Sequence, residues 1–533
     1  MKKRLTAILL TALFLFTGCS EGGAGTVINA DGYDGMILAT EQPIATPVSI
    51  PSAIESSAEP AENIGETTEE TAEEETDLTD DTVETAESND DPIPETAEST
   101  NAPETAATTA DTTTTVATTT TTTTAATTTT TTVTTTTAAT TTTTQTTTTT
   151  TTQAVTTAPQ ITQPSGSNSY IALNYSDVKG VWLSYIELST LLTGKTESQF
   201  TELIRQAFTN CAGMGINTVY VHVRSHGDAY YNSQYFPWSK YVTGTTGGAP
   251  SFDPLKIMTA EAHALGLSFQ AWINPYRLNS ASDMPLVSSD YSTGGWYQSS
   301  EGDRVVSVNG SYYLNPAYDE AVNLIAAGAR EIVANYNVDG IHIDDYFYPT
   351  TDASFDSKAF ATSGYSTLSS FRMNNCDKTV KALYSAVKAG NSTALFGVAP
   401  QGNVQNNYDY MYADVEKWCS STGYLDYIAP QIYFGFKNAS QPYETVLAQW
   451  QSMVSGTGVK LIPGLAVYKI GTEDSSGDGR YEWINDTQII KRQIQSAKAM
   501  SNYGGAILYS YNYVFDTSAA IKAEMNAVKD IFV

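Results

Sequence analysis

Positive charge is almost missing from the first third of this 533-residue chain. No lysine or arginine occurs between Ser20 and Tyr170, although the same stretch holds 24 of the 57 acidic residues. Its second half, over residues 112–157, is almost pure threonine. Such a segment cannot bury enough apolar surface to offset the entropy of an ordered chain. We therefore expect residues 20–170 to form a long disordered stalk that is acidic and then Thr-rich.

Clusters of basic residues are also missing from the remainder of the chain. From Ile171 onward 33 acidic residues stand against 24 basic ones, and no stripe of Lys and Arg is present. Nucleic-acid binding needs clustered positive charge. We therefore expect no nucleic-acid partner, and a neutral or amphoteric ligand fits this composition better.

Cysteine and histidine are scarce, with four residues of each type. Cys211, Cys376 and Cys419 are widely spaced and form no C-x-x-C motif, which argues against a disulfide framework or a zinc site and favours buried free thiols. His222 and His226 have the spacing of a metal pair only on a helix, whereas they fall in and after a predicted strand. We expect no metal and no cofactor.

The amino terminus carries a targeting signal. Three basic residues precede an apolar run, Leu5–Phe16, which is too short to span a bilayer comfortably and is typical of a secretory signal. The small residues Thr17 and Gly18 then precede Cys19, as in bacterial lipoprotein signals, in which that cysteine is lipidated. We expect residues 1–19 to be the signal peptide of a cell-surface protein that touches the membrane only through its lipid anchor.

From about Asn174 the pattern changes to short apolar runs that alternate with helical patterns. The predicted strands are Val181–Tyr185, Thr218–Arg224, Ser268–Asn274, Gly340–Asp345, Ala394–Ala399, Tyr427–Tyr433, Lys460–Val467 and Ala506–Ser510. The predicted helices are Glu197–Met214, Pro254–Leu265, Pro316–Asn335, Ser369–Ala389, Ala413–Ser421, Tyr443–Ser455, Asp486–Met500 and Thr517–Ile531. Eight such units predict one (β/α)8 TIM barrel over residues 171–533. Between the third strand and the third helix, Arg304–Val308 and Ser311–Leu314 predict a β-hairpin around Asn309-Gly310.

Polar side chains take the inward positions of several predicted strands. Alternation places Tyr220, His222 and Arg224 on one side of the second strand, and His342 and Asp344 on one side of the fourth. The interior of a barrel is normally apolar, and an unpaired buried charge costs several kcal/mol. We therefore expect a site at the carboxyl ends of the strands. Asp339 and Asp426 begin strands, so we expect them to act as caps instead.

The predicted catalytic residues are Asp344 and its neighbour Asp345, because two adjacent carboxyls can differ in pKa and divide acid and base roles between them. Polar donors and aromatic rings at the other strand ends are expected to bind the substrate: His222, Arg224, Asn274, Arg277, His342, Gln431, Tyr433 and Tyr468. An ordinary two-acid mechanism would further need a loop carboxylate, with Asp228, Asp409, Glu187 and Glu473 as the candidates.

Several motifs together resemble the glycosyl-hydrolase-like 10 family of bacterial surface barrels. They include Gly180-Val181-Trp182, Ala271-Trp272-Ile273-Asn274-Pro275-Tyr276-Arg277, Asp339-Gly340-Ile341-His342-Ile343-Asp344-Asp345-Tyr346 and Gln431-Ile432-Tyr433. The resemblance spans nearly all of residues 175–533 and implies a (β/α)8 glycosidase that acts on bacterial cell-wall glycan. One branch of the family cleaves peptidoglycan strands stripped of their peptides.

Two more distant resemblances concern the mechanism. The run from Asp339 to Asp344 is similar to the fourth-strand motif of α-amylase-like hydrolases, but His342 stands where arginine is usual and the fifth strand ends without a glutamate. The aspartate pair with Gln431 and Tyr433 also resembles chitinase-like barrels, in which the N-acetyl group of the substrate is the nucleophile. We expect a monomeric glycoside hydrolase of an N-acetylhexosamine-containing glycan, and the alternative is a non-catalytic carbohydrate-binding barrel.

Overall fold

The computed structural model describes residues 161, 163–299, 303–344, 347–474 and 477–533, and two short strands within the threonine-rich stretch. Those strands, β1 (Thr131–Val133) and β2 (Gln145–Thr147), pair antiparallel and belong to a separate unit, Val48–Val155. The signal segment with Cys19, most of the stalk, and Asp345 lie outside the described residues. The predictions made for them remain predictions.

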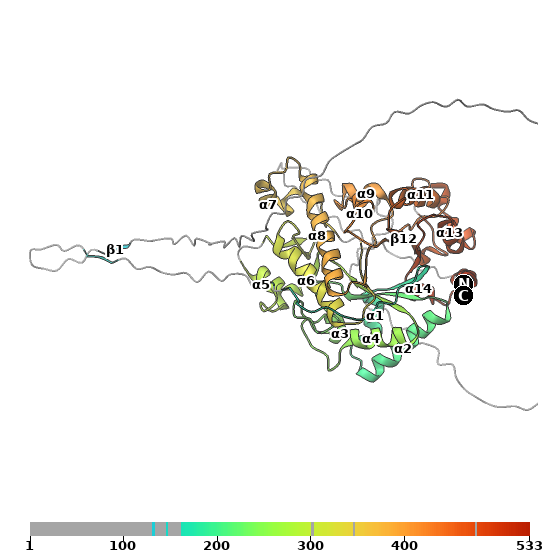
Figure 1. Cartoon of the computed structure of the whole chain (residues 1–533), viewed down its shortest axis with the longest axis horizontal. Helices are drawn as coiled ribbons and strands as arrows, with labels where there is room; N and C mark the ends of the chain where they lie inside the picture. The colour runs from blue at the N-terminus through green and yellow to red at the C-terminus, as the bar shows by residue number, and fades with distance from the viewer. Residues whose placement is uncertain are drawn as a thin grey trace, which may run out of the picture. The chain divides into compact units, whose positions relative to one another are not determined.

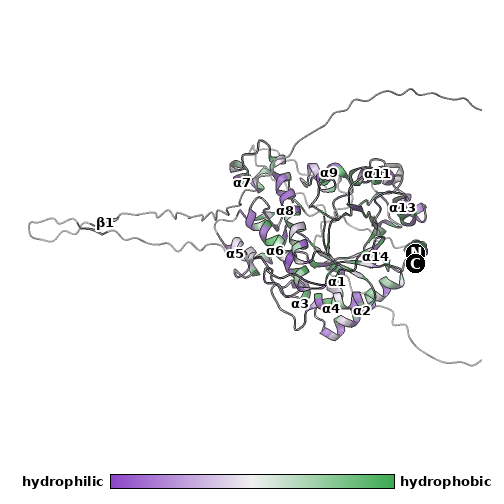
Figure 2. Ribbon diagram, viewed as in Figure 1, coloured by the Kyte–Doolittle hydropathy of each residue, from purple (hydrophilic) through white to green (hydrophobic). Residues whose placement is uncertain are grey.

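A ring of parallel strands forms the centre of the described chain (Figure 2). In ring order the strands are β3 (Val178–Leu183), β4 (Thr218–Arg224), β5 (Ser268–Ile273), β9 (Gly340–Ile343), β10 (Leu395–Val398), β11 (Tyr427–Ile428), β12 (Lys460–Leu461) with β13 (Gly464–Ala466), and β14 (Gly505–Tyr509).

The ring closes through the seventh strand, which is split into β12 and β13 around Pro463. Ile462 N–H donates to Ile428 O at 2.9 Å on one side, and Ile507 N–H donates to Pro463 O at 3.0 Å on the other. Since β14 also pairs with β3, no edge is left in the ring. The predicted (β/α)8 barrel is therefore confirmed.

Eight helices cover the outside of the ring, as predicted. They are α2 (Glu197–Gly213), α4 (Pro254–Ala264), α6 (Asp319–Asn335), α8 (Leu368–Gly390), α10 (Val415–Ser420), α11 (Tyr443–Val454), α13 (Ile489–Lys498) and α15 (Ala519–Phe532). Their starts carry sequence-encoded caps: Thr196 forms a capping box with Gln199, and Asp253 caps α4 ahead of Pro254. Helices α6 and α8 lie side by side (Figure 1).

Shorter elements occupy the loops between the strands and these helices. The short helices are α1 (Tyr185–Leu192), α3 (Lys240–Thr243), α5 (Ser292–Gln298), α7 (Ser357–Thr362), α9 (Val404–Asp409), α12 (Glu482–Asn485) and α14 (Tyr511–Val514). The predicted hairpin is confirmed as β7 (Val305–Val308) and β8 (Ser311–Leu314), and its turn places Asn309 at φ 49° and Gly310 at φ 80°. A third strand, β6 (Arg277–Ser280), joins it and was not predicted.

The core has two parts. Between the strands and the helices lies a large apolar layer that includes Cys211, Cys376 and Cys419, which are buried free thiols as predicted. Inside the ring a smaller cluster contains the rings of Trp182, Tyr220, Trp272 and Tyr427. Glycines make room for these rings, since a Cβ atom on Gly464 would stand 2.6 Å from the Trp182 indole. In the described part of the chain, no helix is long and apolar enough to cross a membrane.

Residues 163–175, which we call the amino-terminal strap, are fastened at the amino end of the barrel. Tyr170 Oη and Leu173 N–H donate to Oδ1 of Asp339 at 2.8 and 2.5 Å. Phe269 N–H donates to Oδ2 at 2.7 Å, and His263 Nε2 lies 2.8 Å from the same oxygen. Asp339 immediately precedes β9, so the prediction that it serves as a structural cap is confirmed.

Candidate active site

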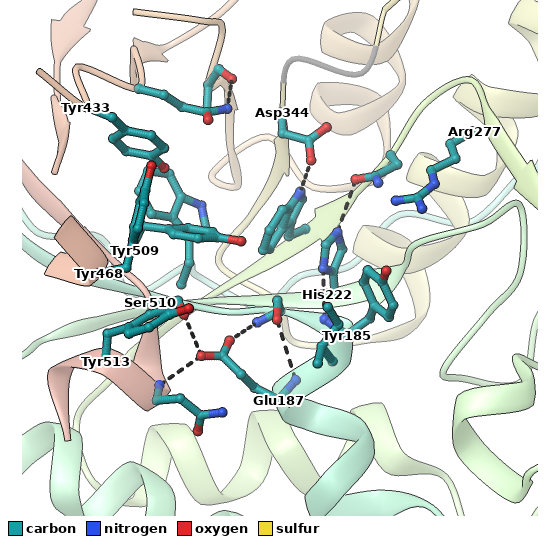
Figure 3. A pocket seen from close by; sticks show the side chains of 18 of the residues that line it. Tyr185, Glu187, His222, Arg277, Asp344, Tyr433, Tyr468, Tyr509, Ser510 and Tyr513 are labelled. Atoms are coloured by element: carbon teal, nitrogen blue, oxygen red, sulfur yellow. Dashed lines mark hydrogen bonds between the residues drawn. The ribbon is translucent and has the colours of Figure 1, made fainter. Parts of the chain in front are cut away.

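A cavity of about 400 Å³ opens at the carboxyl ends of the barrel strands. Two groups of side chains face each other across it (Figure 3). We call the first the polar wall; it follows the second, third and fourth ring strands and consists of His222, Asn274, Arg277 and Asp344. The second, the tyrosine wall, follows the sixth, seventh and eighth ring strands and consists of Tyr433, Tyr468, Tyr509 and Tyr513.

Asp344 lies directly after β9 and points into the cavity (Figure 3). Only 3% of the residue is exposed, and the indole Nε1–H of Trp272 donates to its Oδ2 at 3.1 Å. A carboxyl group held in this way has a fixed direction, which is what proton transfer to a bound substrate requires. The structure thus places this predicted catalytic residue in the cavity.

The side chain of His342 points to the same side of the strand as that of Asp344. It lies two residues earlier in the chain, and therefore roughly 6.6 Å deeper in the barrel. The indole N–H of Trp182 donates to its Nε2 at 3.1 Å, so the proton of this imidazole is on Nδ1, which donates to Tyr427 Oη at 2.9 Å. Burial lowers the pKa of His342 to about 3. The prediction that His342 contacts the ligand is corrected: it lies beneath the cavity, in the packed interior, and is not among the lining residues.

His222 is a neutral imidazole with a fixed tautomer. The backbone N–H of Tyr185 can only donate, so Nδ1 of His222 accepts it at 3.0 Å and the proton is on Nε2. That Nε2–H donates to Asn274 Oδ1 at 3.1 Å. Burial lowers the pKa of His222 well below its ordinary value, and the charge of Arg277 lowers it further. The imidazole also stacks on Trp272, with the ring centres 3.3 Å apart.

The position of His222 determines how the Asn274 amide is turned. Because Oδ1 accepts from the imidazole, Nδ2 is directed elsewhere, and this buried nitrogen has no hydrogen-bond partner among the described residues. Arg277 is partly exposed at the start of β6, with its guanidinium 5.8 Å from the centre of the Tyr185 ring. Both residues line the cavity, where they add hydrogen-bond donors and one positive charge to the polar wall.

Arg224 does not reach the cavity, contrary to the prediction. The pairing of β4 with β5 shifts register after His222, so that Arg224 lies opposite Ile273 and turns toward the helix layer. Its guanidinium packs 4.5 Å from the centre of the Phe236 ring. Burial lowers the pKa of Arg224 to about 10, although the charges of Asp228 and Glu331 oppose this shift. The β-bulge reverses the alternation on which the prediction relied.

The tyrosine wall contains two residues that were predicted and two that were not. Tyr433 and Tyr468 were expected here, and Gln431 lines the same side, with its Nε2–H donating to Ala399 O at 3.1 Å. Tyr509 and Tyr513 were missed. The sequence signal that could have identified them is the run of alternating tyrosines at the end of the eighth strand, Tyr509-Ser510-Tyr511-Asn512-Tyr513.

Of the four loop carboxylates considered, only Glu187 lines the cavity. Asp409 is exposed at the end of α9, and Glu473 pairs with Arg480. Asp228 accepts the backbone N–H groups of Ser225 and His226 and is not a lining residue. Asp516, which was not predicted, lies exposed at the rim of the cavity.

Glu187 connects the first and eighth ring strands. Its Oε2 accepts Ser184 N–H at 2.7 Å, while Oε1 accepts Ser510 Oγ–H at 2.5 Å and Asn512 N–H at 2.8 Å (Figure 3). Burial raises the pKa of Glu187, and these hydrogen bonds partly offset the rise. With three donors at its two oxygens, the side chain acts as a clip between α1 and α14. No group of three or more His, Cys, Asp or Glu side chains in the described residues is arranged to hold a metal ion.

Comparisons with known proteins identify the family to which the chain belongs. The model of the family described as "Glycosyl hydrolase-like 10" matches residues 177–482, which is more than half of the chain. Glycosyl hydrolase YngK of Bacillus subtilis is 32% identical over 313 residues, which cover 54% of this chain and 60% of that protein. Glycosyl hydrolase DigH of Escherichia coli is 29% identical over 403 residues, covering 67% of this chain and 89% of that protein.

Among solved structures, the PgaB (BpsB) glycoside hydrolase domain from Bordetella bronchiseptica is similar to this chain with a TM-score of 0.44 and 11% sequence identity. That likeness covers 67% of this chain and 99% of the other, and it is too distant to bear on the chemistry. The family match and the two curated relatives confirm the prediction of a glycoside hydrolase at the level of the family. The chain belongs to the glycosyl hydrolase-like 10 family.

Proposed function

We propose that this protein hydrolyses glycosidic bonds in an N-acetylhexosamine-containing glycan, with peptidoglycan strands as the substrate, and that Asp344 is the general acid. The observation that carries the proposal is the position of Asp344: a buried carboxyl, oriented by Trp272, that faces a wall of tyrosines across the cavity. Aromatic rings offer sugars a large contact area at little entropy cost. The family match supports the same chemistry.

In this mechanism the carboxyl group of Asp344 donates its proton to the glycosidic oxygen while the bond from that oxygen to the anomeric carbon breaks. Water then forms the new bond to the anomeric carbon and gives up a proton to a carboxylate of the site, either directly or after the N-acetyl oxygen of the substrate has attacked that carbon and closed a ring that water opens. Asn274 and Arg277 supply donors to the bound sugar from the same wall. Asp345 remains the proposed partner of Asp344, and Asp516 at the rim is a further carboxylate within the cavity.

The proposal extends to where the enzyme acts. A lipid on Cys19 would hold a monomer at the cell surface, with a long stalk between the membrane and the barrel. Labelling of expressing cells with a palmitate analogue should mark the wild-type chain and not Cys19→Ser. Equal labelling of both chains would show that the lipid is not on Cys19, and an unlabelled wild type would remove the anchor from the proposal; neither result bears on the chemistry.

The activity is tested by incubating the full chain with peptide-free peptidoglycan strands and with chitin oligomers, followed by mass spectrometry of the products. The variants are Asp344→Asn and, as a matched control, Asp530→Asn, which changes an exposed aspartate on α15. We expect chain shortening by the wild type and the control but not by Asp344→Asn. Shortening by all three would move the catalytic role away from Asp344. If no chain shortens glycan but all retain it in a pull-down assay, the protein is a carbohydrate-binding barrel instead.

A further inference from the structure

The tyrosine wall continues from the interior of the barrel to its surface. The ring of Trp182, which is 2% exposed, has its centre 5.9 Å from that of Tyr509. The centre of the Tyr509 ring lies 6.1 Å from that of Tyr468, and the centre of the Tyr468 ring lies 5.8 Å from that of Tyr513. All four rings line the same cavity. A ligand that enters the cavity therefore meets aromatic surface at every depth.

At the outer end this aromatic surface opens to solvent. Tyr513 is 38% exposed, and Ile186, which lines the cavity from α1, is 53% exposed. The adjacent side chains at the rim, Asn512 and Asp516, are exposed and polar. An apolar surface bordered by polar groups at the mouth of a cavity is typical of a binding site and suits the alternating apolar faces and hydroxyls of a sugar chain.

The rim is held in place before any ligand arrives. Glu187 accepts from Ser510 Oγ–H and Asn512 N–H, and these two residues lie directly beside Tyr509 and Tyr513 in the sequence. Glu187 lies on α1, which follows the first ring strand, whereas its two donors lie at the start of α14, so these bonds hold the backbone that carries Tyr509 and Tyr513. A rim whose backbone is held in this way loses little freedom on binding.

We infer that the tyrosine wall is a binding track for at least two consecutive sugar residues, one inside the cavity and the next at the rim against Tyr513, so that the enzyme favours glycan chains over short fragments. The inference rests on the proposed function, since it names the extent of the substrate at the same site. The size of the cavity agrees with it: about 400 Å³ is near the lower end of the usual range of ligand pockets, roughly 300–1,000 Å³, so a longer strand must continue onto the rim.

The test is the dependence of kcat/KM on chain length, measured with N-acetylhexosamine oligomers and the full chain. The variants are Tyr513→Ala, Tyr513→Phe and, as a matched control, Tyr481→Ala, which removes another exposed tyrosine at the start of α12. For the wild type we expect kcat/KM to rise with oligomer length. In Tyr513→Ala the rise should be reduced roughly twofold to tenfold on the longest oligomers, through KM, and least on the shortest. Tyr481→Ala should follow the wild type, whereas Tyr513→Phe, which keeps the ring, should retain more of the rise with length than Tyr513→Ala does.

A wild-type kcat/KM that does not depend on length, or a loss in Tyr513→Ala that is the same at every length, would overturn the inference while leaving the proposed hydrolysis intact. If the wild type cleaves nothing, hydrolysis fails and the track is tested by calorimetry alone. Affinity that increases with oligomer length, and increases less in Tyr513→Ala, would still support it. Affinity without any length dependence would reject the track as well.

Discussion

The two walls of the cavity are positioned by different kinds of interaction. On the polar wall, hydrogen bonds orient three of the four groups: a backbone N–H fixes His222, His222 fixes Asn274, and an indole fixes Asp344. On the tyrosine wall, rings pack against rings at centre distances near 6 Å. Hydrogen bonds are directional and suit proton transfer, whereas ring packing maintains a shape. Under the proposed function, we expect proton transfer to depend on the polar wall and ring stacking on the tyrosine wall, while Asn274 and Arg277 add donors to the bound sugar.

The largest effect should come from the polar wall. In Asp344→Asn we expect kcat/KM on glycan strands to fall by about 10²–10⁴-fold, because the amide cannot donate an acidic proton to the leaving oxygen. Affinity for the same glycan, measured by calorimetry, should change little since the tyrosine wall is intact. A comparable loss of affinity would show that the two walls are not separable.

Glu187→Gln tests the clip that joins the two halves. The amide can accept through one oxygen only, so at least one of the three donors around it loses its partner. We expect the free energy of unfolding, measured in urea, to fall by about 1–3 kcal/mol. Glu473→Gln is the control: its ion pair with Arg480 is about half exposed, so that change should stay within about 1 kcal/mol. If Glu187→Gln has no more effect than the control, Glu187 is not a clip.

His342 lies under the cavity between the two walls and should make stability depend on pH. Its pKa is about 3 in the folded protein and ordinary in the unfolded chain, so between about pH 6.5 and pH 3 the unfolded chain binds the additional proton. Stability from this group is therefore lost as the pH falls, by about 1.4 kcal/mol per pH unit. Urea unfolding at several pH values should show that His342→Gln removes this part of the slope. An unchanged slope would mean that His342 titrates with the same pKa in the folded and unfolded states.

The smallest effect is expected from Tyr468→Phe. The phenyl ring retains the contacts with Tyr433, Tyr509 and Tyr513, which lie 5.8–6.1 Å away between ring centres. We expect KM to change less than about threefold, whereas Tyr468→Ala should raise it about tenfold by removing the ring. Steady-state kinetics on the same oligomers distinguish the two. A large effect of the Phe variant would mean that the hydroxyl, and not the ring, is what this wall offers the substrate.

Much of this molecule is predictable from its sequence because apolar periodicity repeats eight times. Strand alternation correctly placed His222, Asp344 and Tyr433 at the cavity.

The alternation failed at Arg224, because a β-bulge depends on the pairing with β5 and cannot be recognised from the sequence pattern of the strand alone. Strand β6 was missed because Arg-Leu-Asn-Ser has no alternation and is held by the neighbouring hairpin. Tyr513 and Asp516 lie beyond the strand ends, where loop geometry and not periodicity decides what faces the cavity.

The amino-terminal strap has a mechanical consequence. If the chain is pulled from its amino-terminal side, the load reaches the barrel through Asn168, Tyr170 and Leu173, which bond to Gly390, Asn391 and Asp339. These bonds divide the load between the start of β9 and the end of α8, while Asp344 lies at the opposite end of β9. A pull from this side would therefore load one pole of the barrel, away from the end that holds the cavity. If the proposed anchor is correct, movement of the surface that carries it would leave the shape of the cavity unchanged.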